Sequence, residues 1–370
     1  MHVLLISTSY PRHTSDWRGI FMRYLVAALA REPSIELGVW APPGELPERA
    51  MSVVSPVDAD WLGGLMAAGG VSHMMRSGGW RAWLVPVRLL RMIGKAYRDN
   101  PGVDIYHINW LQCALPLPGN QKPALITVLG NDLRLLKLPF MRTMLLRAMK
   151  RRRVVICPNA DWMRQPLAAA FGGVAEICPV SFGIDPDWYA INRERGLEKP
   201  YRWLAVTRLT ADKIGSLFDW SERFFRDGLR ELHLFGPMQE NVEVPGWVHY
   251  HGPVTPQQLV SEWFPYACGL ITLSRHAEGR PQVMLEAMAA GLPIIASRMP
   301  AHAGIVFDGE TGVLCDDSDG YGAALLKLEN TLTNRRMGEA ARRWVAGEIG
   351  TWDDCAQRYV RIYKRLLGRS

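Results

Sequence analysis

The sequence has few cysteines, and those it has form no pattern. Six cysteines are scattered over 370 residues, with no CxxC pair and no histidine cluster beside them. Neither a disulfide framework nor a zinc site is therefore predicted, and a reducing compartment is favoured.

Long hydrophobic runs are also missing. No apolar stretch approaches the roughly 20 residues that a membrane-spanning helix requires. The opening residues, Met1–Ser7, lack the basic region and the apolar length of a signal peptide. We therefore expect a cytoplasmic protein.

What the sequence does contain is typical of a globular protein with two cores. Hydrophobic residues make up 48% of the chain, mean hydropathy is -0.05, and 370 residues exceed the usual size of one core. Residues 1–185 carry 21 Lys and Arg against 13 Asp and Glu, a net charge of +8; the whole chain carries +7, which leaves -1 for the remainder. The basic first half and the nearly neutral second half indicate different partners.

Short apolar strands alternate with loops and helical segments, and this alternation occurs twice. It predicts two α/β, Rossmann-like domains with parallel sheets, at residues 1–182 and 183–351, joined near Gly183 and followed by an amphipathic helix within 352–370. The stretch 61–98 is expected to be irregular. The expected strands are Val3–Ile6, Leu37–Trp40, Ile105–Ile108, Ala124–Val128, Val154–Cys157, Trp203–Val206, Leu232–Phe235, Val248–Tyr250, Leu270–Leu273 and Ile294–Ser297.

The most informative segment, 274–293, follows one strand, contains a helix and ends at another strand. Glu278 lies in the loop before the helix and Glu286 about one turn inside it. Free amides at a helix start bind anions, and a carboxylate beside them can accept hydrogen bonds from sugar hydroxyls. Two glutamates near a helix start can equally be partners of the helix dipole. The residues at this helix start are Gly279, Arg280, Pro281, Gln282 and Val283.

The full string of this segment resembles the signature of retaining glycosyltransferases of the GT-B fold, the large bacterial group often called family 4. The resemblance implies two Rossmann-like domains that face each other across a cleft, with the acceptor in the first domain and the donor in the second. It also implies that the last helix, 352–370, packs back on the first domain.

A second segment, 204–213, resembles the family's phosphate-binding segment. By resemblance, Arg208 and Lys213 hold the donor's diphosphate, on which negative charge grows as the glycosidic bond breaks. Thr207 stands where the family has glycine, and Ile214 separates Lys213 from the next glycine. Ordinary surface charges after a strand are the alternative interpretation.

The segment 249–254 resembles the strand and loop that hold the nucleotide base through backbone contacts, here at Gly252 and Pro253. By resemblance, Glu286 binds the ribose hydroxyls. Glu278 lies beside the donor sugar and, with Arg208 and Lys213, carries the chemistry.

Three segments of the first domain also resemble the family. The stretch 18–21 resembles its glycine loop, at Gly19. His107 ends a strand, and Asn131 and Asp132 follow another; the resemblance places all three on the acceptor side. The family's histidine is replaced by Leu129, and His107 can equally be a core histidine with satisfied ring nitrogens.

The implied activity is transfer of a hexose from a UDP- or GDP-linked sugar to a saccharide acceptor, without cofactor or metal. The two DxD matches, 58–60 and 185–187, are explained by turn formation. A GT-B phosphorylase, an epimerase and a catalytically inactive glycan-binding scaffold are the alternatives.

Two basic segments that contain apolar residues, 76–98 and 141–153, fit an anionic membrane surface. A lipid-linked acceptor in lipopolysaccharide or cell-surface polysaccharide synthesis follows, with a peripheral position on the inner face of the cytoplasmic membrane. A solvated helix end explains 147–153 equally well. No nucleic-acid-binding module is recognised.

Overall fold

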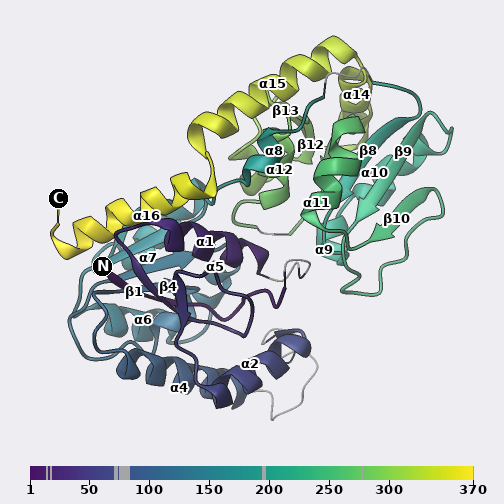
Figure 1. The fold of residues 1–370 in the computed structure, drawn as a ribbon. Helices are drawn as coiled ribbons and strands as arrows, with labels where there is room; N and C mark the ends of the chain where they lie inside the picture. Colours follow the sequence, from purple (N-terminus) through teal and green to yellow (C-terminus); the bar gives the residue numbers. More distant parts are fainter. Residues whose placement is uncertain are drawn as a thin grey trace. The chain divides into compact units, whose positions relative to one another are not determined.

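A computed structural model describes residues 1–13, 16, 19–70, 74, 84–193, 197–276 and 278–369 (Figure 1). The chain forms two compact units. The first unit combines Met1–Phe182 with Trp352–Ser370, and the second is Gly183–Thr351. These are the same bounds at which the sequence pattern divides.

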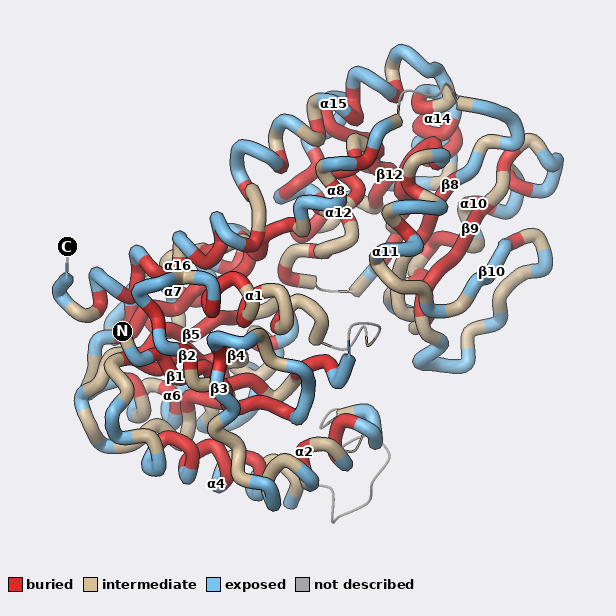
Figure 2. Tube along the Cα trace, in the orientation of Figure 1, coloured by how far each residue is buried: buried red, intermediate tan, exposed pale blue. Residues whose placement is uncertain are grey.

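The first unit contains a seven-stranded parallel sheet in the order β3-β2-β1-β4-β5-β6-β7. Its central strands are buried on both faces, as a parallel sheet covered by helices requires (Figure 2). The strands are β1 (His2–Ile6), β2 (Glu36–Trp40), β3 (Ala50–Ser52), β4 (Ile105–Asn109), β5 (Ala124–Val128), β6 (Val154–Pro158) and β7 (Glu176–Ile177).

Side chains of this sheet alternate between two cores. Val3 and Leu5 pack on one face, with α1 (Ile20–Arg31) and α16 (Trp352–Leu367), whereas Leu4 and Ile6 pack on the other. The remaining helices of the unit are α2 (Pro56–Ala67), α4 (Leu84–Asp99), η2 (Leu111–Ala114), α5 (Asp132–Leu135), α6 (Met141–Met149), η3 (Asp161–Met163) and α7 (Arg164–Phe171).

The expectation that 61–98 is irregular is wrong for its described residues. They include the end of α2 and all but the last residue of α4. The helical periodicity of α4 is real, because Leu89, Met92, Ile93 and Tyr97 are buried along one side. The basic and tryptophan-rich composition of this stretch obscured that spacing.

A buried polar network fixes α16 to the sheet of the first unit. His107 Nδ1 lies 2.5 Å from the Tyr363 hydroxyl, and His107 Nε2 lies 2.9 Å from Thr127 Oγ1. Thr127 Oγ1 is in turn 3.1 Å from the Tyr359 hydroxyl. Both ring nitrogens of His107 are therefore satisfied inside the core.

Burial lowers the pKa of His107 to about 3, so the folded protein keeps this ring neutral. The unfolded chain takes up the proton below about pH 6.5. The stability that depends on this residue is therefore present above pH 6.5 and is lost as the pH falls toward 3.

The second unit contains a six-stranded parallel sheet in the order β10-β9-β8-β11-β12-β13. Its strands are β8 (Tyr201–Val206), β9 (Arg230–Phe235), β10 (Val248–Gly252), β11 (Gly269–Thr272), β12 (Ile294–Ser297) and β13 (Gly312–Cys315). Its helices are α8 (Pro186–Tyr189), α9 (Ala211–Ile214), α10 (Leu217–Phe225), α11 (Pro256–Gln258), η4 (Leu259–Trp263), η5 (Phe264–Tyr266), α12 (Gln282–Ala289), α13 (Pro300–Ala303), α14 (Ser318–Leu328) and α15 (Thr331–Glu348).

All ten expected strands are present, within one or two residues of their expected ends. The sequence pattern missed β3, β7 and β13, which lie at sheet edges. Each has only two to four residues, too few to show a hydrophobic period.

Tyr363→Phe should lower the free energy of unfolding of the first unit by about 1–3 kcal/mol, because it leaves a nitrogen of His107 buried without a partner. Urea titration at pH 7 measures the change. Lys364→Ala alters the exposed neighbouring residue and should change stability by less than about 0.5 kcal/mol. Equal effects of the two substitutions would show that the network does not stabilise α16.

Candidate functional site

The predicted donor-side residues gather at the carboxyl edge of the second sheet. Arg208 and Lys213 follow β8, Gly252 ends β10, and Glu278 follows β11. Ligands of open parallel sheets bind at this edge because the loops there are not used in strand pairing. The sheet therefore brings together residues that are up to 78 positions apart, from Arg208 to Glu286.

A buried ion pair joins two of the predicted catalytic residues. Lys213 Nζ donates a hydrogen bond to Glu278 Oε1. The two side chains are only 12% and 17% exposed. Burial lowers the pKa of Lys213, while the Glu278 charge opposes that effect. Each charge is thus the main compensation for burying the other.

Local structure places Lys213 in this position. The Thr210 side chain caps α9 by accepting a hydrogen bond from the Lys213 amide at 3.3 Å. Gly215 ends the helix with φ 55°, and a Cβ atom there would lie 2.0 Å from the Leu273 carbonyl oxygen. A glycine is therefore required where α9 meets the end of β11, and the intervening Ile214 is buried.

Arg208 adds a second positive charge. Its Nη1 donates to Gln239 Oε1 at 3.2 Å, and its charge contributes to lowering the pKa of Lys213, after burial. Two cations that repel each other in the unliganded protein form a favourable site for an anion.

Backbone hydrogen bonds tie the loop that carries Glu278 to the loop that carries Lys213. The Arg275 amide donates to the Asp212 carbonyl oxygen at 2.8 Å. A side-chain bond joins the same two loops, since Ser274 Oγ donates to the Asp212 carbonyl oxygen at 3.4 Å. These bonds fix the approach of the two charged residues independently of the ion pair. Ala277 lies outside the described residues.

The start of α12 differs in detail from expectation. Pro281 precedes the helix as its N-cap, and Gln282 is the first helical residue. The Gln282 side chain donates to the Gly183 carbonyl oxygen at 2.8 Å, and Val283 packs against the core. The side chains of Gln282 and Val283 therefore hold the start of α12 against the rest of the unit. Gly279 is buried and Arg280 is partly buried, at the same turn.

Glu286 lies inside α12, and its carboxyl group is unusual for a glutamate. Burial, and then the negative charge of Asp185, raise its pKa to about 8. A carboxyl group kept in such surroundings destabilises the protein when ionised, which is common at functional sites.

Two glycines shape the loops beside Arg208. Gly252 has φ 72° and ends β10 at a bulge, and no atom lies within 4 Å of the position its Cβ would occupy. Gly236 follows β9 and donates to the Gly252 carbonyl oxygen at 2.8 Å. A Cβ atom at Gly236 would lie 1.8 Å from the Thr207 carbonyl oxygen. The space beside the Gly252 Cα atom is thus open, and the neighbouring Pro253 is exposed.

Sequence reasoning missed His302, which is fully buried in α13. Its Nδ1 lies 2.8 Å from the Ser297 carbonyl oxygen, and the charges of Glu278 and Lys213 both act on its ring. No signal in the sequence could have found it, because it lies in none of the segments with a recognisable pattern.

The acceptor-side predictions in the first unit need correction. His107 is fully buried and bonded through both nitrogens, so it does not face a ligand. Asp132 is also buried, and it accepts hydrogen bonds from the amides of Leu129 at 2.7 Å and Leu111 at 3.0 Å. Burial raises its pKa to about 7. Both residues hold strand ends in place, whereas Asn131 is exposed.

Gly19 begins α1 with φ 71°, and a Cβ atom there would lie 2.3 Å from Ser9 Oγ. Only glycine fits this approach without a shift of Ser9. Arg18, the other basic residue of the expected loop, lies outside the described residues.

Among the described residues, no group of three or more His, Cys, Asp or Glu side chains is arranged so that it could hold a metal ion. Asp185 caps α8 by accepting from the Asp187 amide at 3.0 Å. Asp58 and Asp60 lie in α2 instead of a turn, where Asp58 suits the positive end of the helix.

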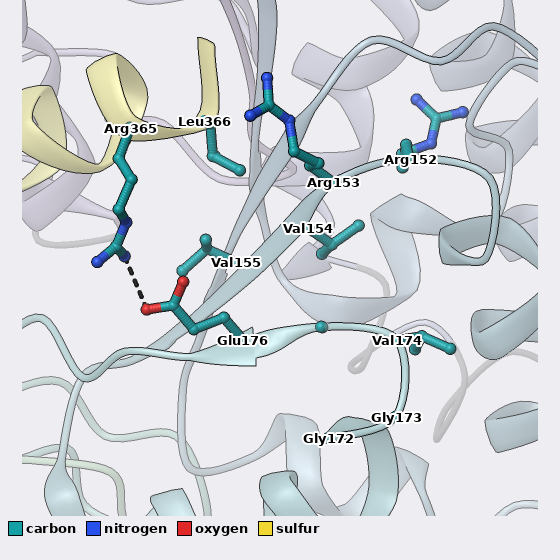
Figure 3. Close-up of a pocket in the computed structure, with 11 residues that line it drawn as sticks. Arg152, Arg153, Val154, Val155, Gly172, Gly173, Val174, Glu176, Arg365 and Leu366 are labelled. Carbon is teal, nitrogen blue, oxygen red and sulfur yellow. Dashed lines mark ion pairs between the residues drawn. The ribbon is translucent and has the colours of Figure 1, made fainter. Parts of the chain in front are cut away.

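A hollow of about 610 Å³ lies on the first unit, at the amino end of β6 (Figure 3). Val154, Val155 and Leu366 border it, together with Arg365, whose guanidinium pairs with Glu176 at 2.8 Å. None of the predicted site residues lines it. It lies at the strand ends opposite to those that carry loops with function in parallel sheets.

The match to a known protein family lies in the second unit. Residues 222–331 match the family model described as Glycosyl transferases group 1. D-inositol 3-phosphate glycosyltransferase of Thermomonospora curvata is 32% identical over 113 residues, 30% of this chain and 26% of that protein. N-acetyl-alpha-D-glucosaminyl L-malate synthase of Bacillus anthracis is 33% identical over 101 residues, 26% of each chain. The chain thus matches about a quarter of the length of these relatives.

Solved structures resemble the whole chain. Sucrose-phosphate synthase of Thermosynechococcus elongatus has a TM-score of 0.72 and 16% identity, with 100% of both chains covered. Anabaena HepE in complex with UDP-glucose has a TM-score of 0.67 and 13% identity, with 99% of this chain and 100% of that chain covered. The GT-B fold class and the resemblance to group 1 glycosyltransferases are therefore confirmed.

Glu286→Gln should stabilise the unliganded protein at high pH. The folded wild type holds a proton on Glu286 up to about pH 8, whereas the unfolded chain releases it near 4.5, so the stability of the wild type declines between these values. At pH 9 the free energy of unfolding of the variant should exceed that of the wild type by about 2 kcal/mol, which is less than the full pKa shift implies because Glu286 is partly exposed. At pH 4 the two proteins should be equally stable. Thermal unfolding at both pH values tests this, with exposed Glu310→Gln as control. An equal effect of Glu286→Gln at both pH values would contradict it.

Proposed function

We propose that this protein is a retaining glycosyltransferase that moves a hexose from a nucleotide diphosphate sugar to a saccharide acceptor. The observation that carries the proposal is the buried Lys213–Glu278 ion pair beside Arg208, at the carboxyl edge of a sheet. The site overlaps the part of the chain that resembles group 1 glycosyltransferases.

The proposed reaction uses each charged residue in a separate role. The bond between the anomeric carbon and the diphosphate oxygen breaks, and Arg208 and Lys213 stabilise the negative charge that remains on the diphosphate. Glu278 contacts the sugar and stabilises positive charge at the anomeric carbon. The acceptor hydroxyl attacks from the face that the diphosphate leaves, and its proton passes to the departing phosphate oxygen. The anomeric configuration is thereby retained, without a metal ion.

In the absence of a donor, Lys213 and Glu278 neutralise each other. A bound nucleotide sugar gives each residue a new partner. Its diphosphate is an anion for Lys213, and its sugar hydroxyls donate hydrogen bonds to Glu278. The exchange makes binding energetically possible at a buried site, because neither charge is left without a partner.

Glu286 and the backbone at Gly252 and Pro253 complete the donor site. Glu286 accepts hydrogen bonds from the ribose hydroxyls, which would compensate for its unfavourable surroundings. The open backbone at Gly252 accommodates the base. Similar folds have been solved with UDP and with UDP-glucose, which supports a UDP-linked donor, with a GDP-linked donor as the second choice.

The first unit carries the acceptor and faces an anionic membrane. Leu138 is 50% exposed, Phe140 79% and Met144 47%, next to exposed Arg142 and Arg147. Such a mixed apolar and basic surface, here named the α6 surface (residues 137–147), suits a lipid-linked saccharide acceptor. This supports a role in cell-surface polysaccharide or lipopolysaccharide synthesis, at the inner face of the cytoplasmic membrane.

The second basic segment contributes less to this surface. Leu84 and Val87 of α4 are exposed, but residues 76–83 lie outside the described residues. In the described parts of the chain, no helix combines the length and the apolar character needed to cross a bilayer.

One of the nucleotides UDP, GDP, ADP and CDP should raise the melting temperature of the wild type, and Arg208→Ala should abolish most of that shift. Loss of a charged hydrogen bond to phosphate should weaken binding about 10- to 100-fold. Arg226→Ala removes an exposed pair with Glu222 and should leave the shift unchanged. If no nucleotide stabilises a folded wild-type sample, the donor site does not exist as proposed.

Phe140→Ser should weaken binding to vesicles rich in phosphatidylglycerol by about tenfold, because an exposed ring no longer enters the interface. Sedimentation with vesicles measures it, and raised salt should weaken the wild type as well. Leu332→Ser changes an equally exposed residue, 79% exposed, in the second unit and is the matched control. Equal losses in both variants, or none in either, would contradict the α6 surface as the docking surface.

A further inference from the structure

His302 is a fully buried histidine close to the charged centre of the proposed donor site. It lies in α13, directly after β12, and is 0% exposed. The charges of Glu278 and Lys213 both act on its ring, Glu278 raising its pKa and Lys213 lowering it. Because β12 pairs with β11, the start of α13 and the loop that carries Glu278 follow neighbouring strands of the sheet.

The hydrogen bonds of the ring define which nitrogen carries the proton. His302 Nδ1 lies 2.8 Å from the Ser297 carbonyl oxygen, which can only accept. Nδ1 therefore donates, and in the neutral ring Nε2 is left as an acceptor. Nε2 is buried and has no hydrogen-bond partner among the residues that the structure describes. A buried acceptor without a partner is costly, so the site is incomplete in the unliganded protein.

Ser297 connects the His302 ring to the loops that carry Glu278 and Lys213. Ser297 Oγ donates to the Ser274 carbonyl oxygen at 2.8 Å. Ser274 Oγ accepts from the His276 amide at 3.1 Å and lies 3.4 Å from the Asp212 carbonyl oxygen. His276 precedes Glu278 by two residues and Asp212 precedes Lys213 by one. The position of His302 is thus fixed relative to both loops.

Lys213 has unused hydrogen-bonding capacity that matches this acceptor. An ammonium group has three N–H donors, and Glu278 accepts from one of them. When a donor sugar engages Glu278 and the diphosphate engages Lys213, the ammonium group loses the carboxylate that compensates for its burial. A neutral imidazole nitrogen can then hold the ammonium group without adding a competing negative charge.

We propose, on the basis of the proposed function, that His302 is a positioning residue of the donor site, whose Nε2 accepts a hydrogen bond from the Lys213 ammonium group while that group holds the donor's diphosphate. It sets the orientation of Lys213 and does not itself touch the sugar. Burial lowers the pKa of His302, which keeps the ring neutral and Nε2 available as an acceptor at neutral pH.

The test compares nucleoside diphosphates with their monophosphates, because the proposal assigns Lys213 to the second phosphate, which a monophosphate lacks. The wild type is titrated by calorimetry with UDP, GDP, ADP and CDP, and the best binder is paired with its monophosphate. His302→Leu removes the acceptor and retains bulk. His302→Gln retains an acceptor at a similar distance from the backbone. Melting curves establish that each variant is folded.

His302→Leu should reduce the preference for the diphosphate over the monophosphate by about tenfold, with monophosphate affinity within about twofold of the wild type. His302→Gln should restore most of the preference. In a Lys213→Ala background, His302→Leu should have no further effect on the preference, since the two residues act through one interaction.

Three results would overturn the proposal. In the first, the preference of His302→Leu for the diphosphate over the monophosphate equals that of the wild type. In the second, His302→Leu weakens the binding of monophosphate and diphosphate equally. In the third, His302→Leu still lowers the preference in the Lys213→Ala background. The second result would mean that His302 only supports the packing of the unit. Failure of all four nucleotides to bind the wild type is a different outcome, and it rejects the proposed function itself.

Discussion

Both sheets are wholly parallel, and this constraint decides where everything else in each unit lies. A parallel strand needs a crossover connection before the next strand begins, and most of these connections contain helices, which cover both faces of each sheet and bury its central strands. Loops without a role in pairing then collect at the carboxyl edge. In the second unit this edge receives Arg208, Lys213, Gly252 and Glu278, from the ends of three strands.

The ion pair between Lys213 and Glu278 is the chemical consequence of that arrangement. Two charged groups that are at most 17% exposed destabilise a fold unless each compensates for the other. A pair of this kind contributes little net stability, but a ligand that carries both an anion and hydroxyl groups can replace it. Glu286 likewise lowers the stability of the unliganded protein when it is ionised, since burial and then the charge of Asp185 raise its pKa to about 8.

His107 and His302 show how the surroundings decide the use of one residue type. Both are fully buried, and burial lowers the pKa of each. His107 bonds Tyr363 and Thr127 through its two nitrogens, which completes its hydrogen bonding and anchors α16. His302 bonds Ser297 through one nitrogen, and its other nitrogen has no partner in the described part of the chain. The hydrogen bonding of the His107 ring is complete without a ligand, whereas that of the His302 ring is incomplete within the described residues.

The two α/β units, their bounds and ten of the strands can be predicted from the sequence, because hydrophobic period and glycine placement are local properties of the chain. The segments that we propose to bind the donor were indicated by their resemblance to a family. Tertiary structure alone decided which polar residues face a ligand. The sequence analysis places His107 and Asp132 at strand ends, but His107 lies in the middle of β4 and bonds α16, and Asp132 is buried and bonds the start of η2. His302 lies outside every motif but comes to the site because β12 pairs beside β11. Burial and contact depend on residues distant in sequence, and no local pattern contains them.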